Sequence, residues 1–176
     1  MPNSRLKALK KALQLENDGM AFYAASMEKS TSQIGQQMFD YLRQSEKGHI
    51  KRISEIYHAL ELSGDWPHIE IAEALAEQES QQRESIFTNA LENIKQQRPL
   101  NTDDLDALKQ ALEFERSGEH FYSEQAKTAE DPFEQAFYQQ LAQEEDQHLR
   151  SIEDSILMLE DPQGFFAQYE KGTLAG

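Results

Sequence analysis

The sequence carries the same set of possible metal ligands twice, and each residue of the first set lies 99 positions before its counterpart in the second. Each set is a lone Glu followed 30 residues later by a Glu-x-x-His: Glu16, Glu46 and His49, then Glu115, Glu145 and His148. Carboxylate oxygens and imidazole nitrogens are donors that transition-metal ions bind in proteins. The pattern therefore predicts a metal centre built from two similar halves.

The repeat extends beyond the ligands. Over Leu6–Ile53, 16 of 48 positions are identical to the segment 99 residues later. A third Glu-x-x-His, Glu55 with His58, is not repeated at that shift. Residue 55 lies nine positions past Glu46, which turns it about 180° away at about 100° per residue. We expect this third pair to face solvent, outside the site.

Apolar residues recur at steps of three and four along four segments, the period of amphipathic helices. The six proposed ligands fall inside these apolar stripes. An ionised carboxylate in a bundle core costs several kcal/mol unless it is compensated, and bound dications would compensate it by direct ligation. The alternative is a buried network of hydrogen bonds and His–Glu pairs. It would leave excess negative charge, since four carboxylates face two imidazoles.

Turn signals place the ligands at matching heights. Ser30-Thr31-Ser32 and Asp131-Pro132 are typical of helix breaks and N-caps. Glu16 and Glu46 lie 15 residues on either side of position 31. At 1.5 Å per residue each is about 22 Å from the turn, so an antiparallel hairpin brings them level. The same arithmetic applies to the second set, and the sequence predicts an all-α four-helix bundle of two helical hairpins.

One domain over residues 1–176 is expected, since a chain of this length can bury a sizeable core. Its parts are a first hairpin over about 4–63, a long helical crossover over 64–101, a second hairpin over about 102–160 and a tail over 161–176. The tail has three aromatic rings that either cap the bundle or contact another subunit: Phe165, Phe166 and Tyr169.

Composition excludes several classes of partner. A net charge of −15 argues against nucleic acid and against an anionic membrane. No stretch approaches the ~20 apolar residues that span a bilayer, and the first residues do not read as a signal peptide. A soluble, cytoplasmic protein is therefore expected. With no cysteine, the chain has no disulfide, zinc–thiolate site or iron–sulfur cluster, so any electron-transfer partner is a separate protein.

With these motifs the chain resembles the rubrerythrin family of the ferritin-like superfamily, over about residues 5 to 160. The resemblance is carried by the two Glu-x-x-His motifs and by two matching segments: Leu13-x-x-Glu16-x-x-Gly19-x-x-Phe22-Tyr23 and Leu112-x-x-Glu115-x-x-Gly118-x-x-Phe121-Tyr122. It implies a ferritin-like four-helix bundle that holds two iron ions, with manganese as the alternative metal.

The resemblance also implies a role for each ligand. Glu16 and Glu115 would be terminal carboxylates, Glu46 and Glu145 would bridge both metals, and His49 and His148 would each bind one. Two tyrosines lie two turns past the lone Glu residues, where they either hydrogen-bond to ligating carboxylates or pack as rings: Tyr23 and Tyr122.

The chain departs from well-known rubrerythrins in two ways. It lacks the rubredoxin domain, whose iron is held by four thiolates. Rubrerythrins also typically place an additional carboxylate three residues after the second lone Glu, where this chain has Gly118. Glu119 is the next residue and could supply that extra ligand, or it could be a partly exposed Glu at the edge of the seam.

The resemblance implies a non-haem di-iron oxidoreductase that reduces hydrogen peroxide or dioxygen to water in defence against oxidative stress. An external electron donor such as a rubredoxin-type protein would then supply electrons. A ferroxidase that handles iron is the main alternative, and a substrate oxygenase is a weaker one. A non-catalytic metal-binding or interaction bundle is the alternative outside enzymes. A homodimer is expected, and exchange of hairpins between subunits is compatible with the repeat.

Overall fold

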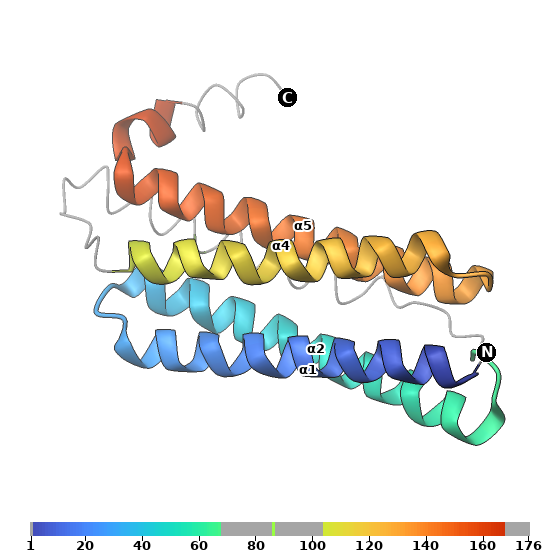
Figure 1. Ribbon diagram of the computed structural model, residues 1–176. Coiled ribbons are helices and arrows are strands. Elements are labelled where there is room, and N and C mark those ends of the chain that lie inside the picture. The colour runs from blue at the N-terminus through green and yellow to red at the C-terminus, as the bar shows by residue number, and fades with distance from the viewer. Residues whose placement is uncertain (1, 68–85, 87–103, 168–176) are drawn as a thin grey trace.

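The computed structural model describes residues 2–67, 86 and 104–167, and these residues form an all-helical bundle without β-strands (Figure 1). Four long helices make up the bundle: α1 (Pro2–Lys29), α2 (Gln33–Ser63), α4 (Leu105–Thr128) and α5 (Pro132–Glu160). The predicted hairpins over about 4–63 and 102–160 therefore correspond to α1–α2 and α4–α5. The crossover predicted over 64–101 lies outside the described residues except for residues 64–67 and 86.

The helices begin and end where the turn residues predict. The hydroxyl oxygen of Ser32 accepts a hydrogen bond from the backbone N–H of Gly35 and so caps α2. The carboxylate of Asp131 accepts from the N–H groups of the two residues after Pro132, which is the first residue of α5. At the far end of α2, Gly64 has a φ of 76°, a left-handed conformation that glycine adopts without strain.

Each hairpin is antiparallel, and the two hairpins pack side by side with α1 beside α4 and α2 near α5 (Figure 1). The end of α2 and the start of α4 lie at opposite ends of the bundle. As a result α2 and α4 run in the same direction. Corresponding helices of the two repeats are therefore brought together around a common centre.

A buried polar joint fixes the two hairpins to each other at one end of the bundle. Asp104, just before α4, is buried, and its carboxylate accepts hydrogen bonds from the hydroxyls of Ser30 at 2.8 Å and Ser32 at 2.5 Å. Both serines belong to the turn between α1 and α2. Each hydroxyl therefore satisfies a charge that burial would otherwise make costly.

The apolar core is divided into two clusters. The first, towards the α1–α2 turn, contains buried residues that include Phe39, Leu42 and Leu108. The second, towards the opposite end, includes Leu9 and Leu141. The six proposed ligands are buried but belong to neither cluster. A layer of polar side chains thus separates two hydrophobic layers of one bundle.

The tail contacts the core of its own chain, as far as it is described. Helical structure resumes over residues 162–167 after α5. Phe165 is buried in the first apolar cluster, and Phe166 packs against that cluster. These two rings cover the end of the bundle, whereas Tyr169 lies outside the described residues.

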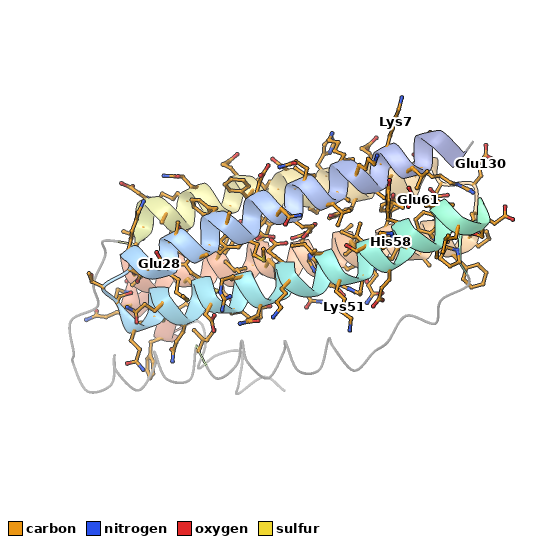
Figure 2. The ribbon with its side chains drawn as sticks, turned by 90° about the horizontal axis from the view of Figure 1, so that it is seen from below. Lys7, Glu28, Lys51, His58, Glu61 and Glu130 are labelled. Atoms are coloured by element: carbon orange, nitrogen blue, oxygen red, sulfur yellow. The ribbon has the colours of Figure 1, made fainter. Side chains whose placement is uncertain are left out.

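The unrepeated Glu-x-x-His faces solvent, as the sequence predicts. Glu55 is exposed, and the side chain of His58 is 71% exposed. Figure 2 labels His58, Lys51 and Glu61 along α2, and all three residues are exposed. Among the described residues, no helix is long and apolar enough to cross a membrane.

Candidate metal centre

The structure brings all six proposed ligands together in the polar layer at the middle of the bundle. Each is at most 5% exposed. They form two groups whose donor atoms lie within 4.8 Å of one another: Glu16, Glu46, His49 and Glu145 in the first, and Glu115, Glu145 and His148 in the second. The first group contains residues from both hairpins, and it shares Glu145 with the second group. The centre therefore depends on how the two hairpins pack.

Glu145 joins the two groups. Its Oε1 lies 3.3 Å from Nδ1 of His49, and its Oε2 lies 3.2 Å from Nδ1 of His148. The two imidazoles are stacked, with ring centroids 5.6 Å apart. Glu46 belongs to the first group alone, although the family resemblance implies a bridging role for it as well as for Glu145.

The lone glutamates complete the two groups from α1 and α4. Oε2 of Glu16 lies 2.9 Å from Nδ1 of His49, and Oε2 of Glu115 lies 3.1 Å from Nδ1 of His148. In both halves the imidazole therefore turns Nδ1 towards the carboxylates. Nδ1 is the nitrogen that would ligate a metal, and Nε2 is left to contact the surrounding protein.

Two buried tyrosines hold carboxylates across the hairpin boundary. The hydroxyl of Tyr23 on α1 donates a short hydrogen bond to Glu115 on α4, and the hydroxyl of Tyr122 on α4 donates one to Glu16 on α1. Burial raises the pKa of both phenols well above its usual value, and the adjacent glutamates raise it further. Both tyrosines thus stay protonated and can position the lone glutamates.

Glu119 is not brought into either group. It is only half-buried, its carboxylate accepts a hydrogen bond from Ser123 at 2.7 Å, and it lines a surface groove between α4 and α5 that also includes Asp146. The expectation that Glu119 supplies an additional ligand therefore finds no support in its position, which is that of a seam-edge residue.

The electrostatics of the ligand layer favour the binding of cations. Burial raises the pKa of Glu115 to about 8, and the charge of Glu145 adds to the rise. Burial and then the charge of Glu16 raise the pKa of Glu46 well above its usual value. Oε2 of Glu46 is buried without a hydrogen-bond partner. Without metal the layer holds extra protons, and dications would replace them.

The imidazoles respond to the same charges. Burial alone would lower the pKa of His49 and His148, but the charge of Glu16 acts on the first and that of Glu115 on the second. The net result raises both pKa values well above their usual range. Four buried carboxylates and two imidazoles fit a pair of divalent ions, since ionised carboxylates would balance the charge of two dications.

One charged group beside the ligands was not anticipated from the sequence. Glu144 is buried next to Glu145, and its Oε2 lies 3.1 Å from Nε2 of His49. Arg52 donates two hydrogen bonds to the same carboxylate. Burial would raise the pKa of Glu144, but its contacts with His49 and Arg52 lower it to about 2. Glu144 and Arg52 each stand where the other repeat has a serine, and this difference is the feature of the sequence that could have indicated the charged pair.

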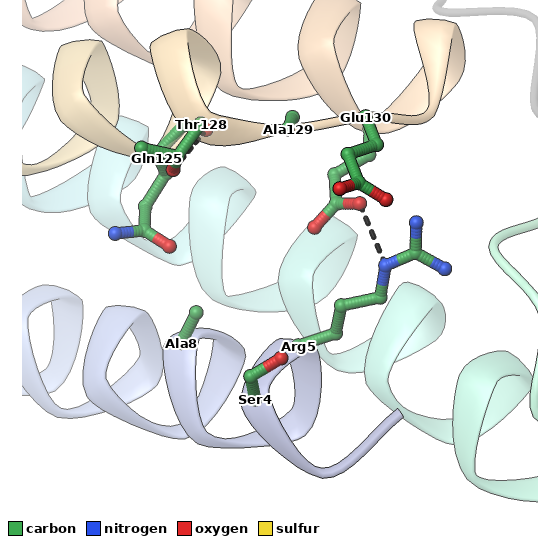
Figure 3. Close-up of a pocket in the computed structure, with 8 residues that line it drawn as sticks. Ser4, Arg5, Ala8, Gln125, Thr128, Ala129 and Glu130 are labelled. Carbon is green, nitrogen blue, oxygen red and sulfur yellow. Dashed lines mark hydrogen bonds and ion pairs between the residues drawn. The ribbon is translucent and has the colours of Figure 1, made fainter. Parts of the chain in front are cut away.

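A separate cavity of about 270 Å³ lies at the end of the bundle, between the first turns of α1 and the α4–α5 turn (Figure 3). Arg5 lines it and pairs with Glu134 at 2.8 Å. None of the six clustered ligands lines this cavity. The cavity is therefore separate from the ligand layer.

Comparisons of the chain with protein-family models, curated proteins and solved structures found no significant match. The features of the chain that bear on its function are the geometry and donor chemistry of the ligand layer.

Two glycines leave room for the central carboxylates, and they lie at equivalent positions of the repeat. A methyl group added at Gly19 would lie 3.1 Å from Oε1 of Glu46, which is tighter than an ordinary contact. A methyl group at Gly118 would lie 3.4 Å from Cδ of Glu145, within the ordinary range. A side chain at position 19 would therefore crowd the ligand layer more than a side chain at position 118.

We expect Gly19→Ala to weaken metal binding by about 10-fold, the lower end of effects seen when groups beside metal ligands are changed. Gly118→Ala is the matched control and should bind metal almost normally. Alanine favours a helix over glycine by up to about 1 kcal/mol, so both metal-free variants should unfold no more easily than the original protein. Calorimetric titration with Co²⁺ measures the difference, and equal affinities in the two variants would contradict this prediction.

Proposed function

We propose that the chain is a non-haem di-iron oxidoreductase, similar to rubrerythrins of the ferritin-like superfamily, which reduces hydrogen peroxide or dioxygen to water. The observation that carries the proposal is the pair of buried donor groups joined by Glu145. One oxygen of this carboxylate faces each imidazole. A carboxylate placed in this way can bind two ions at once, as a reaction that takes two electrons together requires.

The helix arrangement supports the same proposal. Two antiparallel hairpins with α2 and α4 running in the same direction fit a ferritin-like bundle, in which ligands project inward from all four helices. Oxygen and imidazole donors suit iron, with manganese as the alternative.

The chemistry that a pair of ferrous ions supplies here is the two-electron reduction of hydrogen peroxide, which with two protons gives two molecules of water and leaves both irons ferric. The protein's part is to hold the reacting centre in place. The hydroxyls of Tyr23 and Tyr122 fix the carboxylates of Glu115 and Glu16. The two apolar clusters above and below the layer limit the access of bulk water.

These 176 residues contain no cysteine with which to hold a one-iron thiolate centre, so in this proposal another molecule supplies the electrons. For a peroxidase this is a separate reductant, such as a rubredoxin-type protein. For a ferroxidase it is the incoming ferrous ion itself. Gly118 favours the ferroxidase as the second candidate, since it stands where rubrerythrins carry an additional carboxylate.

The test is anaerobic loading with Fe²⁺, a count of metal per chain, and stopped-flow mixing with hydrogen peroxide or with air. We expect two irons per chain and much faster oxidation by peroxide than by air. His58→Ala removes an exposed imidazole of the unrepeated motif and should change neither result.

The outcomes separate the candidates. Faster oxidation by air, with continued turnover of added Fe²⁺, would support the ferroxidase. Failure of the protein to bind two metals would exclude both reactions. Glu46→Ala and His148→Ala should each bind less metal than the original protein, whereas in a non-catalytic helical scaffold they would change only its stability.

A further inference from the structure

The two histidines of the centre have different surroundings on the side away from the carboxylates. Nε2 of His49 lies 3.1 Å from Oε2 of Glu144. Arg52 donates to Glu144 through Nη1 at 3.0 Å and also through Nη2, and Gln140 donates to Oε1 of Glu144 at 3.0 Å. The carboxylate beside His49 is thus held in place from two further sides.

The equivalent positions around His148 carry no such group. The 99-residue repeat places Ser45 opposite Glu144, Ser151 opposite Arg52 and Tyr41 opposite Gln140. The hydroxyl of Ser151 donates to the backbone oxygen of Gln147 at 2.8 Å, and the ring of Tyr41 meets the imidazole of His148 edge-on, with centroids 5.7 Å apart. These residues are neutral.

Nε2 of His148 is accordingly left alone in the described part of the chain. The side chain is 1% exposed, and this nitrogen has no hydrogen-bond partner. Nε2 of His49 makes no hydrogen bond of full geometry either, but it has the carboxylate of Glu144 in ion-pair contact at 3.1 Å. A carboxylate that accepts the N–H of a ligating imidazole fixes its tautomer and makes the opposite nitrogen a stronger metal donor. His49 has a carboxylate within reach of this nitrogen, and His148 has none among the described residues.

The ligands themselves show a second, independent difference. The group around His49 has four members because Glu46 lies in it, while the group around His148 has three. The first group therefore offers one more carboxylate to a cation. Both differences act in the same direction.

We propose that Glu144, held by Arg52 and Gln140, makes the two halves of the centre unequal, so that the His49 half binds the first metal ion and the His148 half binds the second more weakly. This inference rests on the proposed function in requiring a two-metal centre. Glu144 is a positioning residue, since it acts on the metal through His49. The His148 half is then the position that empties first when metal is scarce.

The experiment is a titration of the metal-free protein with Co²⁺, followed by calorimetry and by the visible absorption of each equivalent. We expect two steps in the original protein. Glu144→Gln keeps the shape of the side chain but removes its charge. It should weaken the first step by about 10- to 100-fold and change the absorption of the first equivalent, while the second step stays as it was.

Glu153→Gln is the matched control, because Glu153 is on the same helix but its side chain is 56% exposed. It should change neither step. The two halves are identified by removing each imidazole in turn. His148→Ala should keep one ion at the first affinity, whereas His49→Ala should keep one ion at the weaker affinity.

A converse variant keeps the inference testable if Glu144→Gln does not fold. Ser45→Glu combined with Ser151→Arg places the same charged pair beside His148. This double variant should strengthen the binding of the second Co²⁺ ion and reduce the difference between the two affinities. Far-UV circular dichroism of each metal-free variant checks its fold.

Equal affinities in the original protein, or a Glu144→Gln variant that shifts both steps equally or neither, would overturn the inference while two bound ions leave the proposed function standing. A protein that binds no Co²⁺ would overturn both.

Discussion

Glu145→Ala is expected to remove both metal ions instead of one. Glu145 is the one described residue that belongs to both donor groups, and its two oxygens face Nδ1 of His49 and Nδ1 of His148. Without it, each half loses a carboxylate and the link that holds the pair together. The measurement is metal per chain after loading and desalting, and the expected value falls from two ions to near zero.

Asp146→Ala is the neighbouring control. Asp146 follows Glu145 on α5, but its side chain is 50% exposed and pairs with Arg150 at 2.9 Å. This variant should keep its full metal content. If Glu145→Ala also kept two ions, the shared carboxylate would have no part in binding.

The same variant separates a metal centre from a purely structural network of hydrogen bonds. In a network, loss of Glu145 would leave His148 and Glu115 with one partner fewer and lower the stability of the metal-free protein. In a metal centre, bound Co²⁺ also stabilises the original protein, and this added stability depends on Glu145. We therefore expect Co²⁺ to raise the urea midpoint of the original protein and to leave that of the Glu145→Ala variant almost unchanged.

The spacing within each hairpin could be predicted because helical geometry fixes it. A rise of 1.5 Å per residue places two residues at equal distances from a turn at the same height. Glu16 and His49 consequently meet across α1 and α2, and the buried ligands fall on the faces that the apolar stripes define. The turn residues Ser32 and Asp131 cap the helices for local reasons that the sequence contains.

Contacts between the hairpins could not be predicted in the same way. Spacing within one hairpin does not determine how it is rotated against the other, so the sequence did not specify which carboxylate each tyrosine would meet. In the structure Tyr23 and Tyr122 each contact the opposite hairpin. The pairing of Glu144 with Arg52 and His49 depends on the same rotation.

Glu119 illustrates the limit of the helical stripe. It is four residues after Glu115, and four residues turn an α-helix by about 400°, which leaves Glu119 about 40° to one side. This offset is smaller than the angle of about 60° between Glu145 and His148, so helical periodicity alone does not exclude Glu119 from the centre. In the structure its side chain lies in the groove with Ser123. A stripe with steps of three and four residues includes such edge positions without distinguishing them from the centre.

The metal-free protein is expected to become less stable as the pH rises from about 5 to about 8. Burial raises the pKa of Glu115 from a usual value of 4.5 to about 8 and that of Glu46 well above 4.5. The adjacent glutamates raise the pKa of His49 and His148 well above 6.5, despite burial. These groups hold more protons in the folded chain than in the unfolded one, so raising the pH favours unfolding.

The size of this loss of stability follows from the pKa shifts. Each pKa unit corresponds to about 1.4 kcal/mol, so Glu115 alone contributes a loss of a few kcal/mol over this range. Glu144 has a lowered pKa of about 2, and Glu145 is also held low by hydrogen bonds from Glu115 and His148, despite burial. These two groups change charge below about pH 5 and do not oppose the trend. Urea unfolding in the presence of a chelator, at a series of pH values, measures it.

Metal binding should depend on pH in the opposite direction to the stability of the metal-free protein. Ligands must lose their protons to bind an ion, so affinity for Co²⁺ rises with pH over the same range in which the metal-free fold weakens. Glu115→Gln removes the group whose pKa of about 8 dominates the upper part of the range, and its metal-free form should show a flatter decline. A metal-free protein whose stability stayed constant from pH 5 to 8 would contradict the protonation of the ligand layer. Because each bound ion displaces protons that stabilise the empty fold, the buried carboxylates make folding and metal binding depend on pH in opposite directions.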